Sequence, residues 1–240
     1  MHTVAVVLLL TARIYSNVDV PAGDRGAATH VAAQILRSAG IDILWMDCND
    51  RVTAAGPAAH PACTRPPNQD EVIVRFVSSP ALNNPRTKSG ADSLGDAYVD
   101  TAAARGSLAT VYVDRVAAMA RASGVDAGTL LGRVAAHEIG HLLLGTSAHR
   151  TSGLMRAQWS TTLLQRRMPN DWLFSSRDAA SVREGALKRV RPVPAPASDS
   201  TAATVPCAAP LPATCPSCPV CVTVSPADRM PFHLLVEPSL

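Results

Sequence analysis

The first half of the chain carries three short apolar runs and one amphipathic stretch, a pattern that predicts strands around a helix. The runs cover residues 8–15, 41–46 and 71–77. Apolar runs of this length, rich in β-branched and aliphatic side chains, are typical of buried strands. In the amphipathic stretch, Asp24 is expected to cap a helix that extends to about Ala39 and stops at Gly40. A strand, a helix and a strand in this order predict a right-handed crossover between parallel strands.

Two further apolar runs, Leu94–Asp100 and Leu108–Val113, lie on either side of a polar segment that contains Gly106. They predict either a hairpin or two separate short strands. A brief helical stretch over 117–123 follows, and Gly124 is expected to stop it.

The stretch over 127–144 predicts a helix that is apolar around nearly its whole circumference. Asp126 is expected to cap its first turn, and Gly145 is expected to end it in a sharp turn. A helix without a polar face is buried inside a domain. A last helix over 177–190 closes the predicted domain.

Composition divides the chain into a folded domain, residues 8–190, and a tail. Eleven of the 19 prolines lie in residues 191–240, which predicts a disordered or extended tail without its own core. At the other end, residues 1–15 contain either a signal remnant or the start of the first strand. The tail also contains four cysteines, Cys207, Cys215, Cys218 and Cys221. Because prolines separate them, disulfides or cross-links are favoured over a metal site.

The charge pattern excludes some classes of partner. The formal net charge is only +3, and the 22 Lys and Arg residues are scattered, so no basic face for nucleic acid is predicted. No apolar run is long enough to cross a bilayer. We expect a monomer that neither binds nucleic acid nor spans a membrane.

Cys48 and Cys63 flank a loop rich in Pro, Gly and Ala, where a disulfide would close a flexible segment. Closing such a loop stabilises a fold by about 3 kcal/mol. The alternative is a pair of free thiols in a cytosolic protein. We favour the disulfide, which together with the tail cysteines indicates a secreted or extracytoplasmic protein.

The candidate chemistry is concentrated in residues 137–155, HEIGHLLLGTSAHRTSGLM. His137 and His141 are four residues apart, so on a helix their rings project from one face. Imidazole nitrogen is a preferred ligand of Zn²⁺, and a catalytic zinc site has three protein ligands and one position open to water. Three of the 7 histidines lie in this window, and His149 is the expected third ligand.

These residues resemble the signature of the metzincin clan of zinc metallopeptidases, H-E-x-x-H-x-x-G-x-x-H followed by a methionine turn. His137, Glu138 and His141 match it directly. The resemblance implies that the histidines bind zinc, that Glu138 is the general base, and that Gly145 forms the turn. The sequence SGLM, which ends at Met155, looks like the Met-turn that places a methionine beneath the metal.

The spacing departs from the clan pattern, because one residue is added on each side of the glycine. An added residue rotates a helix exit by about 100°, so the loop after Gly145 must compensate to return His149 to the metal. Other H-E-x-x-H enzymes use a downstream carboxylate as third ligand, which is the alternative here. The candidates for it are Asp171, Asp178 and Glu184.

The resemblance implies an α+β fold of the zincin type, in which a small mixed sheet packs on the active-site helix and a C-terminal helix follows. It implies a zinc metalloendopeptidase that hydrolyses peptide or protein substrates with zinc-activated water and Glu138 as general base. The competing hypothesis is a catalytically inactive zincin-like domain used for binding or as a scaffold.

Three residues or runs near the site have two interpretations each. Leu108–Val113 is either the edge strand that pairs with extended substrate, as in the clan, or an ordinary strand of the sheet. Tyr112 either stabilises the oxyanion or packs in the core. Trp159 either borders a specificity pocket or serves packing alone.

Overall fold

The computed structural model describes residues 8–49, 61–80, 93–166 and 168–190. The expected signal remnant in residues 1–7 and the expected tail over 191–240, with its four cysteines, lie outside the described residues. The predicted first strand is present from Leu8 onward.

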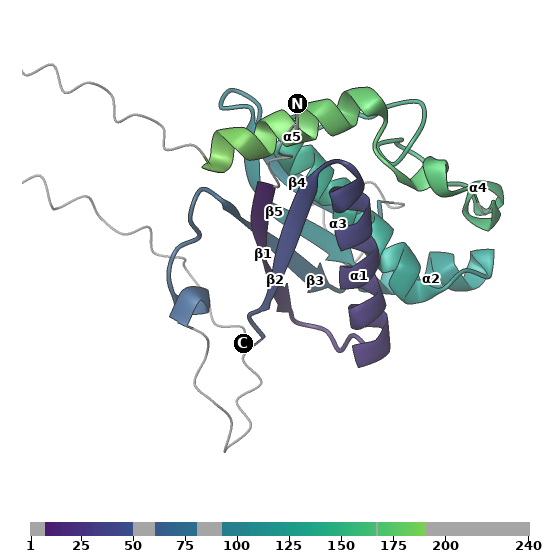
Figure 1. Ribbon diagram of the computed structural model, residues 1–240. Helices are drawn as coiled ribbons and strands as arrows, with labels where there is room; N and C mark the ends of the chain where they lie inside the picture. Colours follow the sequence, from purple (N-terminus) through teal and green to yellow (C-terminus); the bar gives the residue numbers. More distant parts are fainter. Residues whose placement is uncertain (1–7, 50–60, 81–92, 167, 191–240) are drawn as a thin grey trace, which may run out of the picture. The chain divides into compact units, whose positions relative to one another are not determined.

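A five-stranded mixed sheet, with strand order β2-β1-β3-β5-β4, forms the centre of the domain (Figure 1). The strands are β1 (Leu8–Ser16), β2 (Ile41–Asp47), β3 (Glu71–Val77), β4 (Gly95–Asp100) and β5 (Arg105–Tyr112). Neighbouring strands are parallel except β4, which runs antiparallel to β5. The last two apolar runs are therefore a hairpin, and the predicted parallel crossover from β1 to β2 is confirmed.

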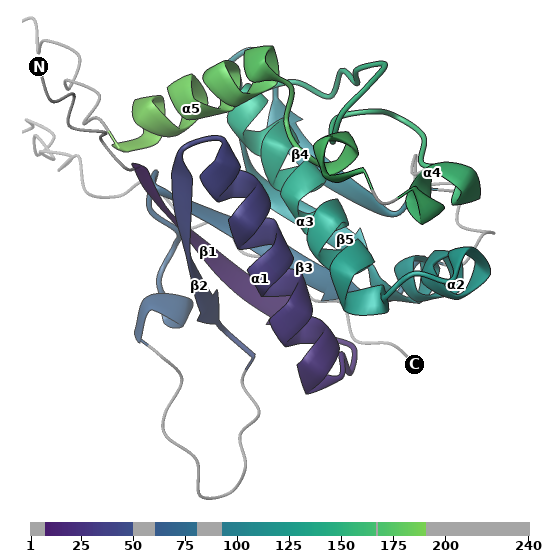
Figure 2. The same ribbon diagram turned by 45° about the vertical axis from the view of Figure 1, so that its right-hand side comes forward.

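Helices cover one face of this sheet, with α1 (Ala22–Ser38) and α3 (Ala127–Leu144) side by side (Figure 2). The remaining helices are α2 (Val113–Ser123), α4 (Thr161–Gln165) and α5 (Ser176–Val190), with short 3-10 turns at Pro61–Thr64 and Pro169–Trp172. The mixed sheet, the histidine-bearing helix packed on it and the C-terminal helix confirm the α+β architecture. In the described part of the chain, no helix combines the length and apolar character that a membrane span requires.

Glycines allow α3 to lie close to α1. A Cβ at Gly132 would stand 2.5 Å from the Ala28 carbonyl oxygen, and one at Gly128 would stand 2.7 Å from Cβ of Ala27. Real Cβ atoms do not approach neighbours this closely, so larger residues at these positions would push the helices apart. The close contact fixes the N-terminal half of α3 on its neighbour and so determines where the histidines of its second half lie.

The structure corrects three sequence predictions. Asp24 is not the N-cap of the first helix, which begins at Ala22 after Pro21; the fixed φ of proline suits it to a helix start, and Asp24 lies in the first turn instead. The helix expected over 117–123 begins at Val113, immediately after β5. Finally, of the two interpretations of Leu108–Val113, the edge strand is wrong and the ordinary sheet strand is confirmed, because β5 pairs with β3 on one side and with β4 on the other.

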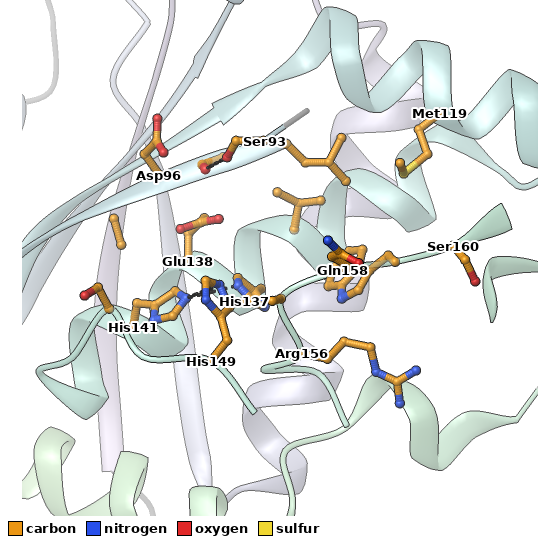
Figure 3. Close-up of a pocket in the computed structure, with 17 residues that line it drawn as sticks. Ser93, Asp96, Met119, His137, Glu138, His141, His149, Arg156, Gln158 and Ser160 are labelled. Atoms are coloured by element: carbon orange, nitrogen blue, oxygen red, sulfur yellow. Dashed lines mark hydrogen bonds between the residues drawn. The ribbon is translucent and has the colours of Figure 1, made fainter. Parts of the chain in front are cut away.

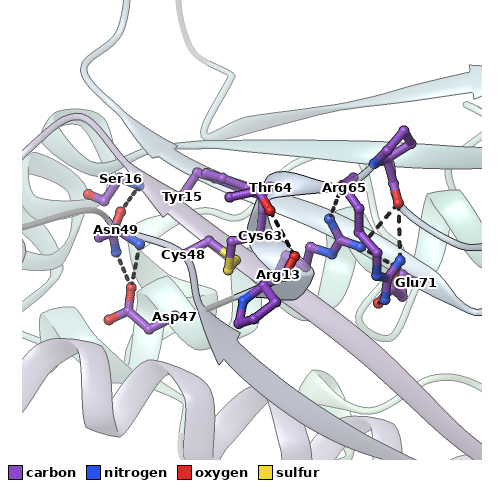
Figure 4. The surroundings of a disulfide bond; sticks show 12 residues. Arg13, Tyr15, Ser16, Asp47, Cys48, Asn49, Cys63, Thr64, Arg65 and Glu71 are labelled. Carbon is purple, nitrogen blue, oxygen red and sulfur yellow. Dashed lines mark hydrogen bonds and ion pairs between the residues drawn. A yellow bond between two sulfur atoms is a disulfide. The ribbon is translucent and has the colours of Figure 1, made fainter. Parts of the chain in front are cut away.

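Cys48, just after β2, lies beside Cys63 of the 3-10 turn Pro61–Thr64 (Figure 4). The two sulfur atoms lie at bonding distance, 1.95 Å, and the Cα atoms are 5.5 Å apart, as in a disulfide. Nearby, the buried guanidinium of Arg13 donates to Glu71 and to the carbonyl oxygen of Arg65, 2.7 Å away. Arg65 also pairs with Glu71, at 2.7 Å. This buried charge network therefore ties the loop to β1 and β3.

Candidate metal centre

Local sequence explains the start and end of α3, the helix that carries His137, Glu138 and His141. The carboxylate of Asp126 accepts a hydrogen bond from the backbone N–H of Thr129 at 2.6 Å, which satisfies one unpaired donor of the first turn. At the other end, Gly145 ends the helix with φ of +64°. The predicted cap at Asp126 and the predicted stop at Gly145 are both confirmed. A Cβ at Gly145 would stand 2.2 Å from the carbonyl oxygen of Ala104, so the hairpin turn also requires glycine there.

The rings of His137, His141 and His149 converge at one wall of a pocket (Figure 3). Nε2 of His141 lies 3.0 Å from Nε2 of His137 and 3.3 Å from Nε2 of His149. The three residues offer ligand atoms that all lie within 4.8 Å of one another. The loop after Gly145 thus brings His149 back to the helix despite the added residues.

The opposite nitrogens of two of these rings are held by backbone carbonyls. Nδ1 of His137 donates to the carbonyl oxygen of Leu154, and Nδ1 of His141 donates to that of Thr146, each at 2.8 Å. A carbonyl oxygen can only accept, so the hydrogen of each neutral ring is on Nδ1 and the lone pair is on Nε2. Two lone pairs that face each other at 3.0 Å repel unless a cation lies between them. The donor set therefore fits a metal ion held by imidazole nitrogens.

The electrostatics keep these rings neutral. Burial, together with the neighbouring His141, lowers the pKa of His137 to about 3. Burial also lowers the pKa of His141 and of His149 below the usual value of 6.5. Neutral imidazole is the form that ligates a metal.

Glu138 points into the same pocket from the adjacent position on α3 (Figure 3). Its side chain is 5% exposed, and burial, with the nearby Asp96 carboxylate, raises its pKa well above the usual range. A Cβ at Gly95 would stand 2.8 Å from Oε1 of Glu138. Gly95 therefore allows strand β4 to lie against this carboxyl group, a role that no local pattern in the sequence indicated.

The pocket has a volume of about 660 Å³ and lies between β4 and the segment after Met155. Apolar side chains from four segments contribute to its wall: Leu94, Met119, Val134 and Trp159. The Trp159 ring stands edge-on to His137, with ring centroids 5.6 Å apart, so this tryptophan borders the pocket. Tyr112 is buried and its hydroxyl donates to Asp96, which agrees with the packing interpretation.

The alternative carboxylates are engaged elsewhere. Asp171 pairs with Arg156 at 3.6 Å, and Glu184 pairs with Lys188 at 2.9 Å on α5. Among the described residues, the group of metal-ligating side chains that comes together consists of the three histidines alone.

Asp178 has a different partner, which lies next to His149 in the sequence. Its buried carboxylate accepts from Nε of Arg150 at 2.9 Å and from the hydroxyl of Ser175 at 2.7 Å. The backbone N–H of Arg150 also donates to the carbonyl oxygen of Met155, 2.8 Å away. The side chain and the backbone of Arg150 each make a hydrogen bond that holds the loop containing His149.

Met155 packs beneath the histidine-bearing part of α3. The residue is 1% exposed, and its Sδ lies 2.7 Å from the position of a Cβ built at Gly140. Gly140, between the two helical histidines, therefore leaves the space that the sulfur occupies.

Comparison with known proteins adds two structures of low similarity. No protein-family model and no curated protein matches the chain. An archaemetzincin from Methanopyrus kandleri is 15% identical, with 75% of this chain and 96% of that chain covered and a TM-score of 0.43. A zinc-dependent peptidase from Methanocorpusculum labreanum is 16% identical, with 71% and 99% covered and a TM-score of 0.46.

Proposed function

We propose that the protein is a zinc-dependent metallopeptidase, with His137, His141 and His149 as zinc ligands and Glu138 as general base. The convergence of three imidazole Nε2 atoms in a pocket, with two rings held at Nδ1, is the observation that supports it most. In a tetrahedral site with Zn–N bonds of about 2.0–2.1 Å, ligand nitrogens lie roughly 3.3 Å apart. Two of the three Nε2–Nε2 separations, 3.0 and 3.3 Å, are close to this value, and the ligand atoms of all three residues lie within 4.8 Å of one another.

Zinc held by three imidazoles would supply a bound water with a pKa of about 7 and would polarise a carbonyl group. With the metal bound, Glu138 would be the group that accepts the proton of the attacking water and delivers it to the leaving amine. Its position beside His137, in the same pocket, favours this role. Met155 is proposed as the Met-turn residue that supports the histidines from below.

Internal peptide bonds are the proposed substrates, because residues of an outer strand of the sheet line the pocket. Strand β4 is the last strand of the described sheet and lines the pocket, and an extended peptide adds to an edge strand through main-chain hydrogen bonds. A secreted or extracytoplasmic location is proposed with it, on the basis of the Cys48–Cys63 pair.

The test compares wild type with Glu138→Gln, which removes the base and keeps the shape of the side chain. Zinc content is measured by atomic spectroscopy after dialysis, and cleavage is measured on casein and on a peptide library. We expect zinc in both proteins and a loss of cleavage of at least about 100-fold in the variant, the usual contribution of a general base. The matched control is Glu184→Gln, an exposed glutamate on α5 that pairs with Lys188, which should cleave as wild type does.

The outcomes separate the two functional hypotheses. Zinc-loaded wild type that cleaves no peptide would favour the binding or scaffold domain. Absence of bound zinc would contradict both hypotheses.

A further inference from the structure

We propose that a second pocket, next to the metal centre, binds a carboxylate of the substrate; the proposal rests on the peptidase function and extends it to substrate choice. This pocket, called here the arginine pocket, has a volume of about 470 Å³. Its polar wall consists of three arginines, Arg150, Arg156 and Arg166, together with Thr151, Gln158, Ser160 and Thr162.

The charges around the arginine pocket favour an anion. None of the described residues that line it is acidic. Asp178, which pairs with Arg150, is 2% exposed, whereas Arg150 itself is 40% exposed. The carboxylate therefore lies behind the arginine, and the guanidinium faces solvent. A guanidinium has five N–H donors, so Arg150 has donors beyond the Nε–H bonded to Asp178.

The arginine pocket continues directly from the metal-site pocket. Four residues of one segment line both cavities: Arg156, Ala157, Gln158 and Ser160. Figure 3 shows the side chain of Arg156 directed away from the three histidines. A peptide lying across the histidines would reach the arginines with a residue some distance from the bond cleaved, since an extended chain advances about 3.3 Å per residue.

The chemistry selects carboxylates among peptide groups. Guanidinium N–H donors match the two oxygens of a carboxylate, and hydroxyl groups such as that of Ser160 add further donors. At the other end of the metal-site pocket, the Asp96 carboxylate would repel an acidic group. An acidic side chain, or a terminal carboxylate, is therefore directed to the arginines.

The test measures binding, so it does not depend on cleavage. Each fluorescein-labelled peptide pool has an acetylated N-terminus and an amidated C-terminus. One position of the peptide is fixed as Glu or Gln, and every other position varies among neutral residues. A further neutral pool carries a free C-terminal carboxylate instead of the amide. Kd is measured by fluorescence anisotropy with the full chain carrying Glu138→Gln, with and without added zinc. In the same background, Arg166→Gln removes an arginine just after α4 and leaves the contacts of Arg150 and Arg156 in place.

We expect Glu pools to bind about tenfold more tightly than Gln pools at one or two positions, as charge-assisted hydrogen bonds provide. The preference should fall towards equality in Arg166→Gln and with added salt, because exposed charges are screened. Arg121→Gln is the matched control, since Arg121 is exposed on α2 and lines neither pocket; it should keep the preference. A preference for the free C-terminus that Arg166→Gln removes would equally support the pocket and identify its ligand.

Equal Kd values for the Glu and Gln pools at every position, and for the free and amidated termini, would overturn the proposal. So would an acid preference that persists in Arg166→Gln. Wild type that shows the preference but cleaves no pool would refute the peptidase function and not the arginine pocket. Cleavage without any acid preference would refute the arginine pocket alone.

Discussion

The contact between Arg150 and Asp178 offers a test of how the third histidine is placed. Asp178→Asn keeps the shape of the side chain and an oxygen that accepts from Ser175, but it removes the charge that faces Arg150. If this ion pair positions His149, the variant should lose zinc affinity as well as stability. If Asp178 were itself the third ligand, the same variant would lose nearly all zinc, and His149→Ala would keep it.

The size of the stability loss follows from burial. Breaking a fully buried ion pair costs about 3–5 kcal/mol, whereas an exposed pair contributes about 0–1 kcal/mol. Asp178 is 2% exposed and Arg150 is 40% exposed, so an intermediate loss of about 1–2 kcal/mol is expected. Residues that hold metal ligands in place typically change metal affinity by about 10–100-fold. Because Arg150 acts on His149 through the backbone, we expect about tenfold weaker zinc binding.

Two measurements check these values on the full chain. Urea denaturation of the zinc-free proteins gives the difference in unfolding free energy, and competition with a chelator gives the zinc Kd. Asp171→Asn is the matched control, because Asp171 also pairs with an arginine of this region, Arg156, at 3.6 Å and with 28% exposure. It should lower stability by less than about 1 kcal/mol and leave zinc affinity as in wild type.

One result would refute the reasoning directly. If Asp178→Asn lowers stability and keeps the zinc Kd of wild type, the ion pair supports the fold and has no part in placing His149. Equal changes of the zinc Kd in Asp178→Asn and Asp171→Asn would also contradict this reasoning. The more buried ion pair would then have no larger effect on zinc binding than the more exposed one.

Three further predictions concern other parts of the domain. His149→Ala should weaken zinc binding at least about 100-fold, and full zinc occupancy with full activity would contradict its assignment. Gly132→Ala should lower the unfolding free energy by about 1–3 kcal/mol, because its Cβ would meet the Ala28 carbonyl oxygen at 2.5 Å; urea denaturation measures this, and an unchanged midpoint would contradict the close helix contact. Burial tends to raise the pKa of Glu71, but hydrogen bonds from Arg65, Asn68 and Arg13 outweigh it and hold the pKa below 4.5. Its ion pairs therefore stabilise the fold above about pH 4.5, and the stability difference between wild type and Glu71→Gln should shrink as the pH falls below that value.

The sequence predicts elements whose causes are local. The Asp126 cap, the turn at Gly145 and the common face of His137 and His141 each depend on residues within one or two helical turns. Strands β1 to β3 are likewise recognisable, because their apolar runs are short and are flanked by turn residues. The start of α1 differs from the prediction. Proline and aspartate both occur at helix starts, and the sequence does not determine whether the helix begins after Pro21 or at Asp24.

Long-range pairing is decided by tertiary structure. Whether Leu108–Val113 lies at an edge depends on where β4 pairs, and apolar alternation is the same on a central and an edge strand. The carbonyls that hold the rings of His137 and His141 belong to Leu154 and Thr146, which are ordinary residues by sequence.

The sequence alone therefore determined which residues are the candidates for the site: two histidines and a glutamate on one helix, a glycine turn, and a third histidine beyond it. Only the tertiary structure decided that the ring of His149 joins the other two. The loop that contains His149 depends on distant contacts, such as the ion pair of Arg150 with Asp178, 28 residues further along the chain. The packing of the folded domain selects a partner so far away in the sequence, and no local periodicity predicts it.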